Sequence, residues 1–214
     1  MQPLLITQLY QDSAANNPTL LKAVEKQFIL GSDYTYTYNE LQGNRPTSGI
    51  YFSGTIDISG NVAGLITGAN VKAGNPKNIL GAQFSQYLKL ESDLRYYAKV
   101  SSGIVWANRL LLGLGLPYGN SDELPFVKQF FVGGNNSIRA FRSRSLGPGT
   151  YQAPPSNTFL PDQSGDIKIE ANTELRAKLF SIVYGAIFAD AGNIWLYNKD
   201  PDKPGAQFTK SFFK

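Results

Sequence analysis

The side chains that could carry chemistry in this chain are acids, lysines, arginines and serines, because the 214-residue sequence contains no Cys and no His. Their absence excludes thiol nucleophiles, disulfides and imidazole bases, and it removes the commonest metal ligands. No motif that would make a serine–lysine pair or a carboxylate pair catalytic occurs, nor does a phosphate-binding or calcium-binding loop. We therefore expect no enzyme, no catalytic residue, no cofactor and no metal site.

One segment, residues 130–149, nevertheless contains several glycines together with arginines, whose side chains bind carboxylates. Its arginines are Arg139, Arg142 and Arg144. A guanidinium holds carboxylates through paired hydrogen bonds, and it needs such partners when it leaves bulk water. Glu174 and Asp190 follow in later segments. The interaction that these residue types can form is an ion pair between an arginine and a carboxylate. The competing interpretations are a solvated basic loop for the arginines and an ordinary turn residue for Asp190.

Residues 83–100 show what must position these groups, because apolar and charged side chains alternate along them. One parity holds Phe84, Leu88, Leu90, Leu94, Tyr96 and Val100, and the other holds Lys89, Glu91, Asp93, Arg95 and Lys99. A period of two predicts a strand, since a helix would mix charge into every face. The stretch exceeds the ~5 to 6 residues of soluble strands and suits a tilted strand that crosses a bilayer.

The alternation recurs often enough to predict about six strands. The other segments are residues 27–39, 50–59, 104–116, 167–176 and 183–190. Glu174 and Asp190 each lie on the polar side of their strands, so both can face the same space.

The links between these strands alternate in length. They are short at residues 101–103 and 181–183, and long at 61–82, 118–165 and from 197 onward. Short turns on one rim and long loops on the other are typical of bacterial barrels. A short helix is possible within residues 19–26.

Composition favours a β fold, with 21 Gly, 12 Tyr and 13 Phe. The net charge of +4 is scattered along the chain, so no nucleic-acid partner is expected. No apolar run approaches the ~20 residues of a membrane-spanning helix. Aromatic residues near strand ends favour a membrane barrel: Tyr96, Tyr97, Trp106, Tyr118, Tyr184 and Trp195. We predict an all-β, antiparallel transmembrane β-barrel portion, with a soluble β-sandwich binding module as an alternative.

The arginine-rich segment resembles the sixth extracellular loop of the BamA-type outer-membrane assembly superfamily, the bacterial surface antigen family. The hallmark is a [VI]-R-G-[FY] tetrapeptide after a Gly-Gly turn, matched here by Gly133, Gly134, Ile138, Arg139 and Phe141, with Ala140 in place of the glycine. Phe188, Asp190 and Gly192 resemble the F-x-D-x-G motif of a later strand. Glu174 sits where the family has an inward-facing acid. The run after Arg139 is most similar to the BamA-like or TamA-like branch found in Bacteroidetes.

The resemblance implies a long loop that folds into the barrel, with Arg139 held by Glu174 and Asp190 as a structural latch. It implies insertion, assembly or translocation of proteins at the bacterial outer membrane. The implied partners are the lipid bilayer, unfolded outer-membrane client proteins and accessory lipoproteins.

The chain is expected to be a single barrel fragment, residues 1–214, because even the smallest membrane barrels have about eight strands. Upstream periplasmic domains and the closing strands would lie outside it, and no signal peptide opens the sequence. The main alternative to an assembly factor is a passive porin or small-molecule transporter barrel, in which Arg139 and the acids would set pore selectivity, and the soluble β-sandwich is the second alternative.

Overall fold

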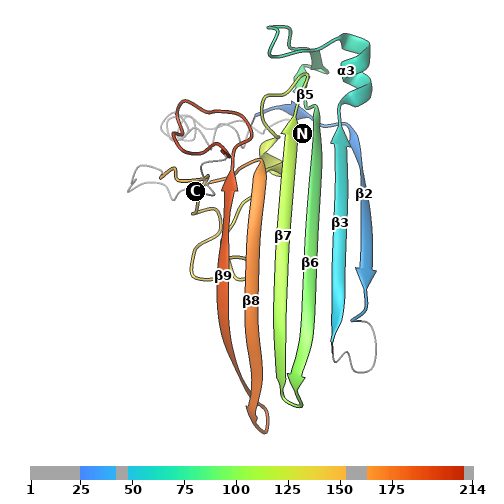
Figure 1. The fold of residues 1–214 in the computed structure, drawn as a ribbon. Coiled ribbons are helices and arrows are strands. Elements are labelled where there is room, and N and C mark those ends of the chain that lie inside the picture. The colour runs from blue at the N-terminus through green and yellow to red at the C-terminus, as the bar shows by residue number, and fades with distance from the viewer. Residues whose placement is uncertain (1–24, 42–47, 153–162, 210–214) are drawn as a thin grey trace, which may run out of the picture.

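The computed structural model describes residues 25–41, 48–152 and 163–209, and one six-stranded antiparallel sheet dominates it (Figure 1). The strands in spatial order are β2 (Gly31–Asn39), β3 (Gly49–Ser59), β6 (Tyr87–Ser101), β7 (Ile104–Pro117), β8 (Ile167–Phe180) and β9 (Val183–Trp195). Each strand pairs with its neighbours along the chain, as in an up-and-down barrel. The predicted class, an antiparallel and incomplete barrel portion, is confirmed.

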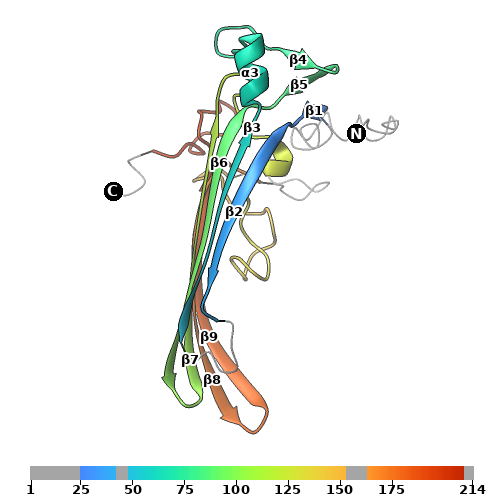
Figure 2. The same cartoon turned by 90° about the vertical axis from the view of Figure 1, so that its right-hand side faces the viewer.

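Smaller elements sit at the long-loop end of the sheet (Figures 1 and 2). They are β1 (Gln27–Phe28), α3 (Asn61–Thr67), β4 (Asn78–Ile79), β5 (Ala82–Phe84) and the single-turn helix η1 (Phe126–Lys128). The three short strands form a second sheet in the order β1-β5-β4. No helix among the described residues is long and apolar enough to span a membrane.

The two faces of the large sheet differ in polarity as the alternation predicts. Paired residues share a face, so the register aligns Leu94 with Leu110 and Ala171 on one face and Asp93 with Leu111 and Glu170 on the other. Large apolar side chains on the first face are exposed: Ile56, Leu94, Trp106, Leu110, Leu112, Leu175 and Ile187. In the part of the chain described, no second sheet covers this face, as a soluble sandwich would require. An exposed apolar face of this kind suits lipid.

The buried apolar core lies between the long loop and the sheet. Phe130, Val132 and Ile138 of the loop cluster with Ile194 of β9, and Leu146 packs against them. Figure 2 shows the sheet nearly edge-on, with the helix η1 on one side of it. The loop is therefore ordered by a small core of its own on the polar side of the sheet.

Two segments predicted as single strands are each interrupted. Residues 27–39 divide into β1 and β2, and residues 83–100 divide into β5 and β6. The breaks coincide because β1 pairs in parallel with β5 outside the main sheet. The Ser59 hydroxyl lies 3.1 Å from the carbonyl oxygens of Leu30 and Ser85, which ties the two breaks together.

Other expectations about elements need correction. Phe84 is buried at the rim and not on the lipid-facing side. Trp195 is buried too, because its ring packs edge-on against Phe208 at a centroid distance of 5.3 Å. The long link 61–82 contains α3, and β8 and β9 run further than predicted. Most of the suggested helix at 19–26 lies outside the described residues.

Candidate functional site

The guanidinium of Arg139 lies between two carboxylates on the polar face of the sheet. Its Nε and Nη2 donate to the two oxygens of Asp190 at 2.8 and 2.9 Å. Its Nη1 donates to Glu174 at 2.5 Å. The structure thus brings together, in one ion-paired cluster, the three side chains singled out in the sequence. We call Arg139, Glu174 and Asp190 the Arg139 cluster.

Strand register explains why the two acids meet. Asp190 of β9 pairs with Asn172 of β8, and Glu174 lies two residues further along β8 on the same face. The Asn172 amide donates to Asp190 and to the carbonyl of Ser137, each at 3.0 Å. Asn172 therefore orients the acceptor and fastens the loop beside it.

The arginine is held on its flat side as well as along its edge. Its guanidinium carbon lies 3.6 Å from the ring centroid of Phe188, which is within cation–π range. Its backbone N–H donates to Asp190 at 3.2 Å. Ile138, which directly precedes Arg139 in the chain, is buried and anchors the loop in the apolar core described above.

The cluster is largely shielded from water. The exposed side-chain fractions are 25% for Arg139, 16% for Glu174 and 4% for Asp190. The hydrogen bond to Asp190, with that to Glu174, raises the pKa of the Arg139 guanidinium above its usual range. A charge-assisted, two-acceptor contact in such surroundings is stronger than a surface ion pair.

The remaining residues of the loop motif lie close to Arg139 in the chain. Gly133 and Gly134 adopt φ of 94° and 96°, and a side chain on Gly133 would collide with the carbonyl oxygen of Arg142. Ala140 is not among the described residues with positive φ, so the position does not need glycine here. Phe141 is exposed.

Gly192 serves the strands and not the loop. A Cβ there would lie 2.8 Å from the carbonyl oxygen of Ile169 on the neighbouring strand. The motif glycine thus permits close pairing of β8 and β9 beside the acids.

Further loop anchors escaped the sequence analysis. Glu170 is completely buried, accepts the Ser137 hydroxyl at 2.5 Å and pairs with Lys168 at 3.0 Å. Arg109 donates to the Asn136 carbonyl at 2.9 Å and also pairs with Asp93. The alternation of side chains along β8 could have indicated Glu170, because residues 170, 172 and 174 share the polar face.

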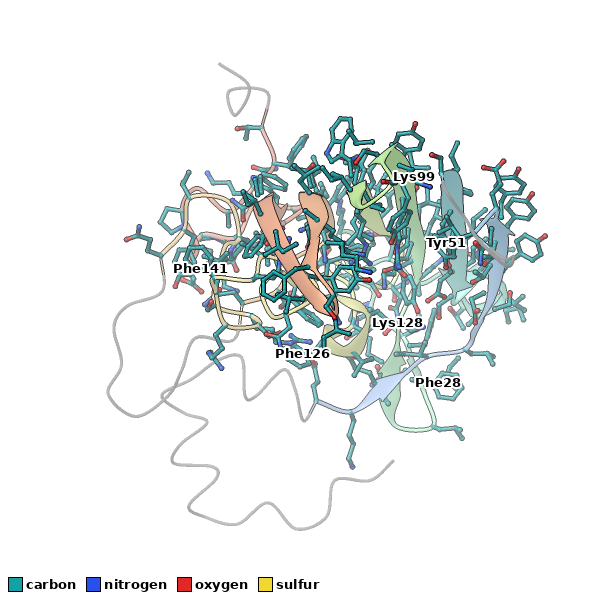
Figure 3. The ribbon with its side chains drawn as sticks, turned by 90° about the horizontal axis from the view of Figure 1, so that it is seen from below. Phe28, Tyr51, Lys99, Phe126, Lys128 and Phe141 are labelled. Atoms are coloured by element: carbon teal, nitrogen blue, oxygen red, sulfur yellow. The ribbon has the colours of Figure 1, made fainter. Side chains whose placement is uncertain are left out.

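Lys128 provides a separate anchor near the β3 side of the sheet. Its Nζ lies 2.7 Å from Asp57, to which the Tyr87 hydroxyl donates at 3.3 Å. The hydrogen bond that Lys128 donates to Asp57 raises the pKa of the Lys128 ammonium. Figure 3 looks along the sheet from the short-turn end and shows Phe126 and Lys128 on the concave side. The loop is therefore fastened to both halves of the sheet.

Replacing Lys128 with alanine should loosen this second anchor only modestly, because about a third of its side chain is exposed. We expect a loss of about 1 kcal/mol in loop docking. Thermal unfolding of the reconstituted protein, followed by the gel mobility shift of folded barrels, measures the effect. Lys99→Ala, at an exposed strand position, is the control. We rank the Lys128 anchor below the Arg139 cluster. Destabilisation by Lys128→Ala as large as that by Arg139→Ala would contradict this ranking.

Two glycines of β7 make room for the loop on the polar face. A Cβ on Gly113 would lie 2.6 Å from the Phe130 ring, and one on Gly115 would overlap the Leu124 side chain. The Lys89 ammonium lies 4.5 Å from the centroid of the same Phe130 ring. Glycine is required here for close approach of the loop and not for backbone conformation.

Gly113→Val should push Phe130 off the sheet and destabilise the docked loop by about 1 to 3 kcal/mol. Faster cleavage of the loop by added protease would report the change. Gly103→Ala is the matched control, because a Cβ there meets Lys178 only at an ordinary 3.6 Å. Equal cleavage of Gly113→Val and wild type would exclude the steric role.

A polar cavity of about 390 Å³ borders the Arg139 cluster. Its lining includes Arg95, Arg109 and Arg176, and Arg176 shares Glu174 with Arg139 through a 2.6 Å contact. The Arg144 guanidinium lies 4.5 Å from the Phe131 ring centroid. In the described residues, no group of three or more acids is placed to hold a metal ion. The ion pairs of Arg139 with Asp190 and Glu174 and the Arg109 hydrogen bond to Asn136 join the loop to the polar face of the sheet.

Comparison with known proteins agrees with this architecture. Residues 7–211 match the Omp85 superfamily domain. BamA of Neisseria meningitidis serogroup B, an outer membrane protein assembly factor, is 25% identical over 178 residues, covering 77% of this chain and 21% of that protein. The crystal structure of BamA from Haemophilus ducreyi lacking POTRA domains 1–3 is similar in fold, with a TM-score of 0.55 and 21% identity over 77% of this chain and 30% of that one.

The chain spans about a fifth of the length of the Neisseria relative. The family match, by contrast, covers most of this chain, and the likeness in fold covers 77% of it. The resemblance inferred from the loop and strand motifs is thereby confirmed at the level of the family. The chain belongs to the Omp85 superfamily, and it forms part of a BamA/TamA-type β-barrel of the bacterial outer membrane.

Proposed function

We propose that this chain is the barrel segment of a factor that inserts, assembles or translocates proteins at the outer membrane. The observation that carries the proposal is the Arg139 cluster, which fastens a long loop to the inner wall by two carboxylates. Family membership supports it, as does the similarity to a protein named an outer membrane protein assembly factor.

In this proposal Arg139 is a structural latch and the protein is not an enzyme. Docking of the loop keeps one wall of the barrel rigid while clients engage elsewhere. Clients would gain backbone hydrogen bonds by adding strands to an open edge, and would bury their apolar faces in lipid. No cofactor is needed, because the free energy comes from client folding.

The partners follow from the same chemistry. The exposed apolar face of the sheet requires the lipid bilayer. Unfolded outer-membrane proteins would be the clients, and accessory lipoproteins would assist. The alternative of a passive porin or small-molecule transporter is less well supported, because the loop occupies the polar face that would otherwise line an open pore.

Reconstitution distinguishes these functions. The complete protein that carries this chain, incorporated in phosphatidylcholine vesicles, should accelerate folding of an added unfolded barrel protein, detected as protease-protected client. Ion conductance of the same vesicles is measured in parallel. Accelerated client folding is the expected result. High steady conductance with client folding no faster than in empty vesicles would instead favour the porin.

A further inference from the structure

The helix α3, Asn61–Thr67, turns its apolar side away from the protein. Val62, Leu65 and Ile66 have exposed fractions of 69%, 87% and 79%. Their spacing of i, i+3 and i+4 places them on one face of the helix. A helix on the surface of a water-soluble protein turns its apolar side chains towards the core. An apolar stripe that faces outward therefore marks a surface that contacts lipid or protein.

The orientation of this stripe is fixed by contacts on the opposite side of α3. Gly64 packs so closely on the Gln86 side chain that a Cβ would overlap it. Gln86 is itself buried and accepts the backbone N–H of Asn120. The Tyr118 hydroxyl donates to Asn61 at the start of the helix. The apolar stripe is therefore held outward by polar anchors.

The height of α3 relative to the membrane follows from the strands. At the long-loop end, the last apolar row of the lipid-facing side aligns Ile58, Leu88 and Leu116. Towards the other end, the row of Tyr96 brings in polar groups, because Tyr96 aligns with Asn108 and Thr173, and the Trp106 indole of the next row donates to Thr173 at 2.8 Å. The span along β6 from Leu88 to Tyr96 is roughly 20 to 27 Å, depending on tilt, and matches a ~25 Å apolar band.

The helix thus begins within a few residues of the edge of the apolar band. Asn61 follows Ile58 closely in the chain, and both views place α3 above the ends of β3 and β6, apart from residues 133–150 (Figures 1 and 2). Lys72, in the turn after the helix, is exposed and can meet anionic headgroups. Apolar contact and basic charge here continue the lipid-facing surface.

We propose that α3 lies in the headgroup region of the outer-leaflet bilayer, with Val62, Leu65 and Ile66 inserted among the upper acyl chains. The helix is an interfacial anchor that sets the height of the barrel at its long-loop end. The occupant of the stripe is lipid and not another protein.

Cysteine labelling tests the assignment, because the chain has no native Cys. Leu65→Cys in the complete protein, with any cysteine elsewhere replaced, is labelled with a polarity-sensitive fluorophore in phosphatidylcholine vesicles containing phosphatidylglycerol. Leu112→Cys on the lipid-facing side and Ala73→Cys in the exposed turn after α3 are the matched controls. Lipids that carry a quencher high in the acyl chain are then added.

The dye at Leu65 should show a blue-shifted emission and lose intensity to the lipid quencher, as at Leu112, while the dye at Ala73 should show neither effect. Emission at Leu65 that resembles that at Ala73 would overturn the proposal, because the stripe would then face water. A blue shift without quenching by lipid would also overturn it, because protein would then cover the stripe.

Discussion

Replacing Arg139 with alanine is expected to release the loop from the inner wall and to abolish most client assembly. The substitution leaves Asp190 and Glu174 without their shared cation in a site where Asp190 is 4% exposed. Removing one member of a shielded ion pair costs about 3 kcal/mol, which corresponds to a shift of ~100-fold in loop docking. The client-folding assay in vesicles and protease cleavage of the loop measure the two effects.

Arg176→Ala is the matched control for this experiment. Arg176 also pairs with Glu174, but half of its side chain is exposed and Glu174 keeps Arg139 as a partner. Its loss should change loop docking by less than ~1 kcal/mol. Arg139→Lys should recover only part of the function, because an ammonium cannot form the forked contact. If Arg139→Ala and Arg176→Ala behaved alike, the specific role of Arg139 would be refuted.

Asp190→Ala should be almost as damaging as loss of Arg139. The carboxylate accepts the Arg139 backbone N–H, the Arg139 Nε and Nη2, and the Asn172 amide. Alanine removes all of these acceptors, and Glu174 alone then neutralises the guanidinium. We expect destabilisation of the docked loop by about 2 to 4 kcal/mol. Loop proteolysis and client folding provide the measurements.

Asp190→Asn separates charge from geometry at the same position. Asparagine retains one acceptor oxygen for the backbone N–H and loses the ion pair, so its effect should lie between those of wild type and Asp190→Ala. Asp33→Asn, an exposed acid of β2, serves as the control for general loss of strand charge. Equal activity of Asp190→Ala and wild type would show that the contact is dispensable.

The sheet could be predicted because local alternation decides it, and the Arg139 cluster could be predicted only with the family motifs in addition. Alternation along residues 167–176 and 183–190 shows which side chains share a face, and the polar face that holds Glu174 and Asp190 follows from it. The pairing partner of Arg139 came from the family motifs, because no local pattern specifies which acid a loop arginine will reach. The structure places all three groups in contact.

The remaining features depend on contacts between distant segments. The breaks at Leu30 and Ser85 arise from a parallel pairing of β1 with β5 and from the Ser59 hydroxyl between them. The Lys128–Asp57 contact joins residues 71 positions apart. Helix α3 contains three β-branched residues and a glycine, so its helix propensity is weak. Its formation depends on packing at the rim.

The most direct test of the account is a double-mutant cycle on Arg139 and Asp190. A cysteine at Val132, which is fully buried in the loop core, reports undocking through its rate of reaction with a water-soluble maleimide. Arg139→Ala and Asp190→Ala should each accelerate labelling strongly, and the double variant should add little to either, because both remove the same contact. Labelling that stays slow in both single variants, or effects that simply add, would contradict a loop held by this ion pair.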